Sequence, residues 1–269
     1  MIIDAPFTII TGASQGFGKS LALECASRGM NLILVSLPGS GLIELSDYIK
    51  SNFSISVIQF EMDLCDDNNY QELHNSILKN DIPVRYLINN AGMLSQGYFE
   101  DMDLSYCQKL IQLNTIAPTL LTKLFLPILK KNSPSVILNV ASLSSFFYLP
   151  CKQVYGGTKS YLLSFSRSLR RELISQGIKV STVCPGGLNS NTKITYQNRT
   201  GSLFSQASIL NTEVAAKITI QGMLKGKELI IPGKLNRFFL LLNKILPDPI
   251  KRFITRTQMA KFKGSYAYV

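Results

Sequence analysis

The segment FTIITGASQGFG, residues 7–18, decides the fold class, because it joins an apolar run to a helical pattern through a glycine-rich turn. Residues 7–12 read as a buried strand, and residues 17–29 have the pattern of a helix. Gly12, Gly16 and Gly18 allow the backbone to turn tightly and to approach a phosphate group closely. The N-terminus of the following helix favours the negative charge of such a group. We therefore predict a phosphate-binding turn between this strand and this helix.

The alternation of apolar run and helical pattern continues over most of the chain. Predicted strands cover residues 7–12, 31–36, 56–62, 84–90, 135–142, 178–185 and 227–233, and predicted helices cover about 17–29, 41–52, 67–80, 104–131 and 152–176. Strands that are apolar throughout are buried on both faces, and strict alternation with helices implies parallel strands with right-handed crossovers. The sequence thus predicts an α/β fold: a doubly wound, Rossmann-type parallel sheet of about seven strands with helices on both faces.

The composition is that of a large folded unit. Hydrophobic residues make up 46% of the 269 residues and charged residues 17%, which excludes global disorder. We predict one domain over residues 1–232 and a C-terminal helical extension over 233–269. The N-terminal residues lack the basic segment of a signal peptide, and no apolar run is long enough to span a bilayer. We therefore expect a cytoplasmic protein.

Cysteine and histidine usage argues against disulfide and metal chemistry. Five cysteines are scattered without a CxxC pair, and the chain has a single histidine, His74. This pattern favours reduced thiols over a disulfide framework or a zinc site. We therefore predict no metal site, and we expect the buried cysteines to serve ordinary packing.

Further motifs follow the predicted strands in a fixed order. They are Asn89-Asn90-Ala91-Gly92 after the fourth strand, Asn114, Ser142, Tyr155-Gly156-Gly157-Thr158-Lys159, and Pro185-Gly186 after the sixth strand. Together with the GxxxGxG spacing of the first turn, they resemble the short-chain dehydrogenase/reductase family over about residues 7–190. The resemblance implies an enzyme that transfers hydride between NAD(P)H and a ketone or secondary alcohol. It also implies a homodimer or homotetramer.

Tyr155 and Lys159 form the predicted proton-transfer pair. They are four residues apart in a predicted helix, so their side chains lie on one face. A phenol with a pKa of about 10 is a poor base at neutral pH, and a neighbouring ammonium group lowers that pKa. Lowering it by about three units needs roughly 4 kcal/mol, which Lys159 and the positive ring of oxidised nicotinamide can supply jointly. We predict that Tyr155 is the proton donor and acceptor.

Two further residues complete the predicted catalytic set. Ser142 ends the strand over 135–142, where its hydroxyl can hold and polarise a substrate carbonyl. Ser144 and Ser145 are alternatives, but the thirteen-residue spacing to Tyr155 favours Ser142. The resemblance implies that Asn114 holds a water molecule near the lysine and extends a proton relay; a capping or kink residue is the alternative.

The resemblance also implies the cofactor contacts. Asp63 would bind the adenine amino group, Asn90 and Gly92 would line the ribose and nicotinamide side, and residues 185–188 would meet the carboxamide, with Ser190 standing where a threonine is usual. The predicted cofactor-binding residues are Gly12, Ser14, Gln15, Gly16, Phe17, Gly18, Ser36, Asp63, Asn90, Ala91, Gly92, Tyr155, Lys159, Pro185, Gly186 and Leu188.

The end of the second strand bears on the choice between NAD and NADP. NAD sites usually place an acid there to bind the ribose 2′-hydroxyl, but residues 35–38 read VSLP. Ser14 or Ser36 can donate to a 2′-phosphate, and Lys19 is a candidate cation. Against this, Leu37 stands where NADP-binding members often carry arginine, and Gln15 replaces a frequent basic residue. We predict NADP in preference to NAD.

The C-terminal segment is strongly basic, with ten Lys or Arg against two acids from residue 225 onward. Leu235, Phe238, Phe239, Leu242, Ile245 and Leu246 recur at helical spacing between the basic residues. Such a stretch can lie on a membrane surface. We favour the alternative in which its apolar face covers the substrate pocket or packs in an oligomer interface. Residues 190–211 are predicted to form a variable lid, in which Tyr196, Leu203 and Phe204 indicate an apolar substrate.

The sequence therefore predicts an NAD(P)(H)-dependent oxidoreductase acting on a small, lipophilic ketone or alcohol. One alternative is a dinucleotide-binding regulatory protein on the same fold. Another is a membrane-associated protein whose basic tail is its working part. Nucleic-acid binding is disfavoured, because no recognition motif accompanies the basic residues.

Overall fold

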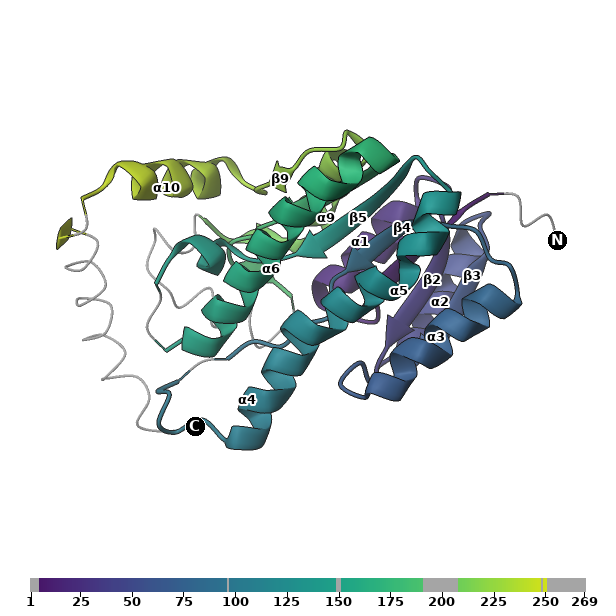
Figure 1. The fold of residues 1–269 in the computed structure, drawn as a ribbon, viewed down its shortest axis with the longest axis horizontal. Helices are drawn as coiled ribbons and strands as arrows, with labels where there is room; N and C mark the ends of the chain where they lie inside the picture. The colour runs from purple at the N-terminus through teal and green to yellow at the C-terminus, as the bar shows by residue number, and fades with distance from the viewer. Residues whose placement is uncertain (1–4, 96, 149–150, 191–207, 248, 251–269) are drawn as a thin grey trace.

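The computed structural model describes residues 5–95, 97–148, 151–190, 208–247 and 249–250. Its centre is a seven-stranded sheet with the order β3-β2-β1-β4-β5-β6-β9, in which every paired neighbour is parallel (Figure 1). The strands are β1 (Phe7–Thr11), β2 (Asn31–Ser36), β3 (Val57–Glu61), β4 (Val84–Asn89), β5 (Ser135–Val140), β6 (Ile178–Val183) and β9 (Leu229–Ile230). The predicted doubly wound α/β fold is confirmed.

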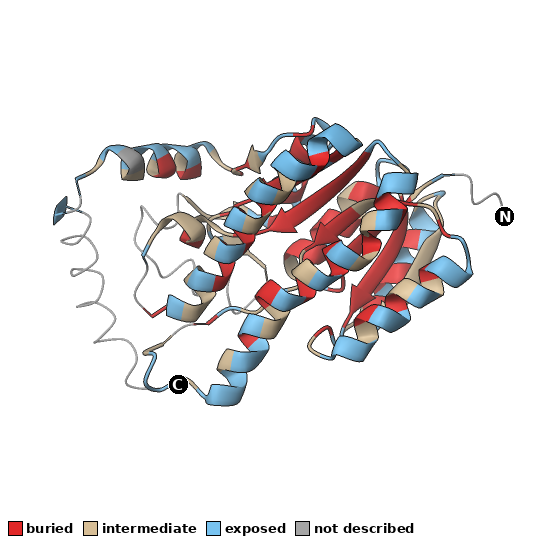
Figure 2. Cartoon of the chain, viewed as in Figure 1, coloured by how far each residue is buried: buried red, intermediate tan, exposed pale blue. Residues whose placement is uncertain are grey.

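Helices cover both faces of this sheet. One face carries α1 (Gly16–Ala26), α2 (Leu42–Asn52) and α9 (Thr212–Leu224), and the other carries α3 (Asp67–Lys79), α5 (Ala117–Lys131) and α6 (Gln153–Leu173). Adjacent residues of one strand therefore enter different cores: Ile10 packs beneath α1, whereas Ile9 packs beneath α3 and α5. This two-sided burial explains why the strands are apolar throughout (Figure 2).

The helix predicted over residues 104–131 is present without a gap, but it is not α-helical throughout. It consists of α4 (Leu104–Ile111), a π-helical turn η1 (Gln112–Ile116) and α5. A π-helical turn adds one residue to a helical turn and occurs most often at functional sites. Here it contains Asn114, one of the predicted catalytic residues.

The edge of the sheet beyond β6 also differs from the prediction. α9 was not predicted, because Thr, Val and Ile residues in it lower its helix propensity. The predicted strand over 227–233 is reduced to two residues in β9. Just before the predicted lid over 190–211, β7 (Leu188–Asn189) pairs with β8 (Leu210–Asn211) at the end of the lid, whereas Tyr196, Leu203 and Phe204 lie outside the described residues.

The last described helix, α10 (Lys234–Ile245), follows β9 and extends beyond the sheet (Figure 1). Within the part of the chain that the structure describes, no helix combines the length and apolarity needed to cross a bilayer. The described residues also contain no group of three His, Cys, Asp or Glu side chains placed to hold a metal ion. All five cysteines are free thiols.

Candidate active site

The predicted site residues gather at the carboxyl ends of β1, β4, β5 and β6. The chain builds outward from β1 to β2 and β3, and then crosses to β4 on the other side of β1. In a doubly wound sheet, this reversal of strand order opens a crevice beyond the strand ends. The glycine turn borders the crevice on the β1 side, and the serine, tyrosine and lysine border it on the β5 side.

The glycine turn leaves little room for side chains at its three glycine positions. Gly12 and Gly16 have positive φ angles of 64° and 54°, a conformation that favours glycine. A Cβ atom at Gly18 would collide with the carbonyl oxygen of Gly12. The N-cap residue of α1, Gln15, makes no capping hydrogen bond with its side chain, and the first turn of α1 holds no acid. The main-chain N–H groups at this helix end are therefore open to an anionic group.

Asn90 holds this turn in place. Its amide nitrogen donates to the main-chain oxygens of Thr11 (2.9 Å) and Gly12 (3.0 Å). The hydroxyl of Thr11 in turn accepts from the N–H groups of Asn90 and Ala91, both at 3.0 Å. Sequence reasoning placed Asn90 against the cofactor and missed Thr11. In the structure, the Asn90 amide ties the end of β4 to the end of β1.

Phe17 differs from its prediction as a cofactor-binding residue. Its side chain is buried in the core between α1 and the sheet, so that only its main chain faces the turn. Gly16, in contrast, lies against Ser190, since a Cβ atom at Gly16 would be 3.3 Å from the Ser190 Cβ. The segment after β6 therefore approaches the glycine turn at Ser190.

Tyr155 and Lys159 lie on one face of α6 and meet Ser142 beyond the end of β5. The Lys159 Nζ atom is 5.9 Å from the centroid of the Tyr155 ring and donates to the main-chain oxygen of Val140 at 2.8 Å. The Ser142 hydroxyl accepts from the N–H of Ser144 at 3.1 Å. The structure thus brings the three predicted groups together.

Burial is the largest influence on the pKa values of Tyr155 and Lys159. Burial of the phenol raises the pKa of Tyr155 above its ordinary value, and the hydroxyls of Ser142 and Ser144 act in the opposite direction. Burial lowers the pKa of Lys159 to about 8. The predicted lowering of the Tyr155 pKa involves Lys159 together with oxidised nicotinamide and stays a prediction; in the chain alone, removal of the phenol from water raises the pKa of Tyr155.

Cys184 is a neighbour that sequence reasoning placed only in the core. It is fully buried, and it is close enough to Tyr155 and Lys159 to influence the pKa of each. Burial raises the pKa of its thiol to about 12, so it stays protonated. It packs with Ala141 and Leu163 and closes the floor of the site.

Asn114 and Gly92 lie on the other side of Lys159. The Asn114 amide accepts from the N–H of Met93 (2.9 Å) and donates to the Met93 oxygen (3.0 Å) and the Thr158 hydroxyl (3.1 Å). A Cβ atom on Gly92 would be 3.0 Å from Asn114 Oδ1 and 3.2 Å from Lys159 Nζ. The side chains of Asn114 and Lys159 therefore both approach the main chain at Gly92, in the wall of the crevice.

Three serine hydroxyls gather where the second strand ends. Ser14 Oγ and Ser36 Oγ are 2.7 Å apart, and Ser40 Oγ lies 3.1 Å from Ser36 Oγ. Sequence reasoning missed Ser40. It also missed the acid nearest to this point, Glu61, which pairs with Ser36 in register from β3 and accepts from the N–H of Gly39 at 3.2 Å.

The remaining predicted cofactor residues border the same crevice. Asp63 follows β3, is exposed and accepts from the N–H of Cys65 at 2.9 Å. Gly186 lies against α10, since a Cβ atom there would be 2.8 Å from the amide atoms of Asn236. Leu188 belongs to β7.

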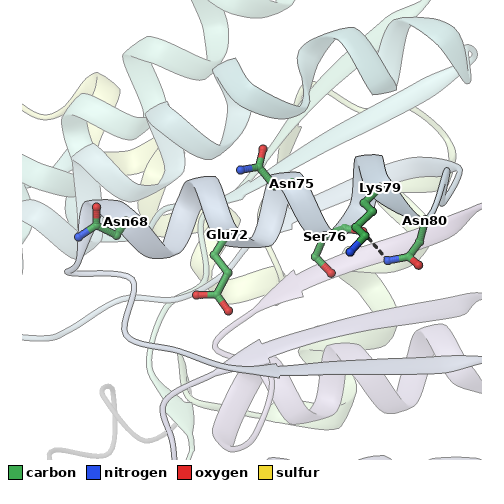
Figure 3. Close-up of a pocket in the computed structure, with 6 residues that line it drawn as sticks. All are labelled: Asn68, Glu72, Asn75, Ser76, Lys79 and Asn80. Carbon is green, nitrogen blue, oxygen red and sulfur yellow. Dashed lines mark hydrogen bonds between the residues drawn. The ribbon is translucent and has the colours of Figure 1, made fainter.

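A separate depression of about 700 Å³ lies along α3. Figure 3 shows its lining side chains on that helix and its C-terminal end, with a hydrogen bond from Asn80 to the main chain of Ser76. None of the predicted site residues lines it, and one helix supplies all of it. It is a feature of the helix surface and carries no part of the candidate site.

Comparison with known proteins agrees with this geometry. The family model for short chain dehydrogenases matches residues 6–201. The chain belongs to the short-chain dehydrogenase/reductase family. Its relatives include the very-long-chain 3-oxoacyl-CoA reductase of Rattus norvegicus, which is 35% identical over 184 residues, 66% of this chain and 58% of the rat protein. The chain therefore spans little more than half the length of that relative.

Solved structures of family members share the fold. A short-chain dehydrogenase from Sphingobium yanoikuyae in complex with NADPH is 26% identical, with a TM-score of 0.76, covering 90% of this chain and 97% of that one. The bulky-bulky ketone specific alcohol dehydrogenase from Comamonas testosteroni, at 24% identity, has a TM-score of 0.75 and covers 99% of this chain and 97% of its own. At that identity the second likeness concerns the fold alone.

Proposed function

We propose that this short-chain dehydrogenase/reductase interconverts a lipophilic ketone and its secondary alcohol, with NADP(H) as the hydride carrier. One observation carries the proposal: Ser142, Tyr155 and Lys159 converge beside a crevice whose opposite wall is the glycine turn. The open N-terminus of α1 and the close-fitting glycines suit a dinucleotide pyrophosphate.

When bound, the nicotinamide supplies or accepts the hydride. The chain's own residues manage the oxygen and its proton. Ser142 donates a hydrogen bond to the substrate carbonyl oxygen and holds it near Tyr155. Tyr155 gives its hydroxyl proton to that oxygen in reduction and takes the proton from the alcohol in oxidation. Lys159, beside the ring, stabilises the phenolate that remains.

Asn114 supports the pair through its position. Its amide is committed to Met93 and Thr158, and the Thr158 hydroxyl donates to the Tyr155 main-chain oxygen at 2.8 Å. Because the π-helical turn shifts the main-chain pairing, we propose that the main-chain carbonyl of Asn114 holds the water that extends the proton relay from Lys159.

The serine cluster favours NADP in this proposal. The hydroxyls of Ser14, Ser36 and Ser40 can donate to a 2′-phosphate, and no acid stands at the end of β2 itself. Glu61 opposes the preference, although Gly39 holds its carboxylate. The complex of the Sphingobium relative with NADPH supports the same choice.

The proposed substrate class is a lipophilic carbonyl compound. The rat relative is named for reduction of very-long-chain 3-oxoacyl-CoA. Near the site, the Tyr148 side chain is 98% exposed and Leu94 is 52% exposed, so apolar groups are open to a substrate. We include long-chain 3-oxoacyl thioesters and bulky ketones among the compounds to test.

We also propose a homo-oligomer in the cytoplasm, built on the exposed apolar side chains of α5 and α6. Leu120 and Tyr161 are exposed, and the Tyr161 and Thr119 hydroxyls bond at 3.0 Å between the two helices. Sedimentation velocity of the full chain tests the oligomer. A monomer at every concentration refutes it.

The experiment that tests the activity is a cofactor titration by fluorescence, NADPH against NADH, followed by a carbonyl screen with the tighter-binding cofactor. We expect NADPH to bind more tightly and to be oxidised with at least one lipophilic ketone. Tight binding without oxidation of NADPH by any carbonyl would instead favour a dinucleotide-binding regulatory protein.

A further inference from the structure

α10 presents polar side chains to the rest of the protein. The Asn236 side chain is buried, and its amide donates to the main-chain oxygens of Pro232 (2.9 Å) and Ser208 (3.1 Å). One turn on, Leu240 is buried, and after it Asn243 donates to the main-chain oxygen of Phe146 at 3.1 Å. These positions recur at helical spacing and mark the inward face of the helix.

The outward face of α10 is apolar. Phe238, Leu241, Leu242 and Ile245 are 55%, 57%, 38% and 71% exposed. With 3.6 residues per turn, they fall within an arc of about 100° centred opposite Asn236. A surface helix of a soluble protein turns its apolar stripe toward the core. α10 turns Leu240 toward the core but leaves this second apolar face outward, and the outward face lacks a covering element among the described residues.

The charge around this face narrows the choice of partner. Lys234 and Arg237 are exposed on α10. From residue 233 to the end, the sequence holds eight Lys or Arg and one acid, Asp248. Two copies meeting through this face would bring Lys234 and Arg237 of one copy close to those of the other, and like charges repel each other. A basic amphipathic helix with Phe and Leu on its apolar side matches an anionic lipid surface.

We propose that α10 docks on an anionic phospholipid surface, with Phe238, Leu241, Leu242 and Ile245 entering the boundary between headgroups and acyl chains. Arg237 then contacts lipid phosphate groups from the flank of the apolar face, and Lys234 contacts them from its N-terminal end. The asparagines hold the helix to the protein from the opposite side.

The docked helix also places the active site beside the lipid. Asn236 lies against Gly186 in the turn after β6, and Asn243 binds Phe146 in the 3₁₀ turn η2 (Leu143–Phe146) directly after Ser142. α10 is therefore fixed to two segments that border the catalytic serine. This part rests on the proposed function: a lipophilic substrate would enter from the membrane without crossing water.

The test is flotation of the full chain with vesicles of phosphatidylcholine containing about 30% phosphatidylserine, compared with pure phosphatidylcholine. We expect at least tenfold stronger partitioning to the anionic vesicles, weakened by 0.5 M salt. The variant F238S/L241S/I245S should lose at least tenfold in partitioning. The matched variant I43S/L78S/L104S, altered at three exposed apolar residues outside α10, should partition like the wild type.

Several outcomes would overturn the proposal. They are no partitioning of the wild type, equal partitioning to neutral vesicles, or equal loss in the two triple variants. A concentration-dependent self-association that only the α10 variant loses would assign the face to a second copy. Thermal unfolding and NADPH affinity confirm that both variants are folded.

A kinetic measurement separates this proposal from the proposed function. Anionic vesicles should raise the turnover of a vesicle-dissolved ketone severalfold for the wild type and leave that of a water-soluble ketone unchanged. Should no ketone be turned over, the proposed function fails while the flotation result stands. Turnover of both ketones without flotation refutes the docking of α10 alone.

Discussion

Substituting Gly92 with alanine tests whether the crevice wall positions Lys159 and Asn114. An added Cβ atom would be 3.2 Å from Lys159 Nζ and 3.0 Å from Asn114 Oδ1, tighter than ordinary contacts. Neither neighbour can move away freely. Lys159 is held by its hydrogen bond to Val140 at 2.8 Å, and the Asn114 amide is held by three hydrogen bonds. The methyl group therefore has to displace one of them by a few tenths of an ångström.

The expected magnitude follows from those contacts. Overpacking of a buried site costs about 1–3 kcal/mol in unfolding free energy. A displacement of 1 Å at a catalytic group lowers the rate by about 100-fold. Because the required shift is smaller, we expect kcat to fall by about 10-fold and the free energy of unfolding by about 1–2 kcal/mol. NADPH affinity should change less than kcat.

The matched control is Gly157→Ala in α6, two residues from Lys159. A Cβ atom at Gly157 meets no atom within 4 Å, and the position is helical. Alanine there should stabilise the protein by about 0.5–1 kcal/mol and leave kcat unchanged. The assays are NADPH oxidation under saturating ketone and urea unfolding. A kcat for Gly92→Ala within twofold of the wild type, or an equal loss in both variants, would refute the assigned geometry.

Three further predictions concern the proton donor, the cofactor and the lysine. Tyr155→Phe should lower kcat by at least 1000-fold and keep NADPH affinity, while Tyr161→Phe on the same helix keeps both; near-normal turnover of the first variant would end the proposed mechanism. Ser36→Asp should weaken NADPH binding at least tenfold and strengthen NADH binding, because its carboxylate repels a 2′-phosphate; unchanged NADPH affinity would place that phosphate elsewhere. Lys159→Met removes an amine whose pKa burial lowers from 10.5 to about 8. Between those two pH values the unfolded wild-type chain binds more protons than the folded chain, so the stability of the wild type rises with pH. The unfolding free energy of the variant relative to the wild type should therefore fall by about 1 kcal/mol from pH 8 to pH 9, as measured by urea unfolding. A difference that stays constant over this range contradicts the lowered pKa of Lys159.

Elements that depend on local pattern were predictable from the sequence. β2 was predicted residue for residue, and the other sheet strands before β9 within two residues at each end, because continuous apolar runs bounded by turns are a strong signal. The tyrosine, lysine and serine of the site followed from their spacing. α9 and the π-helical turn were not predictable in this way. α9 forms because burial of its apolar side chains outweighs the weak helix propensity of its residues. The π-helical turn depends on a shift in the main-chain hydrogen-bond pattern, which the residue types do not indicate.

Most of the unpredicted site contacts cross between distant segments. Thr11 bonds the main chain of residues about 80 positions away, and Ser36 meets Glu61 only because β2 and β3 pair in register. Thr158 connects to Asn114 over 44 positions. The hydrophobic periodicity of a single segment does not indicate such a contact. They become visible only when the parallel sheet brings the strand ends to one edge.

The orientation of α10 shows how such distant contacts can decide which way a helix faces. Its periodicity indicated an apolar stripe, and the favoured interpretation was that this stripe covers the substrate pocket or packs in an oligomer interface. In the described helix, Phe238, Leu242 and Ile245 of that stripe are exposed. The reason lies in the loops beneath it. Pro232, Ser208 and Phe146 each present a main-chain oxygen, and Asn236 and Asn243 satisfy them. A leucine turned inward would leave those oxygens unpaired, at about 1–3 kcal/mol for each buried group. The inward face of α10 therefore holds Asn236 and Asn243 beside Leu240, and the apolar residues of the outward face remain exposed on the described surface.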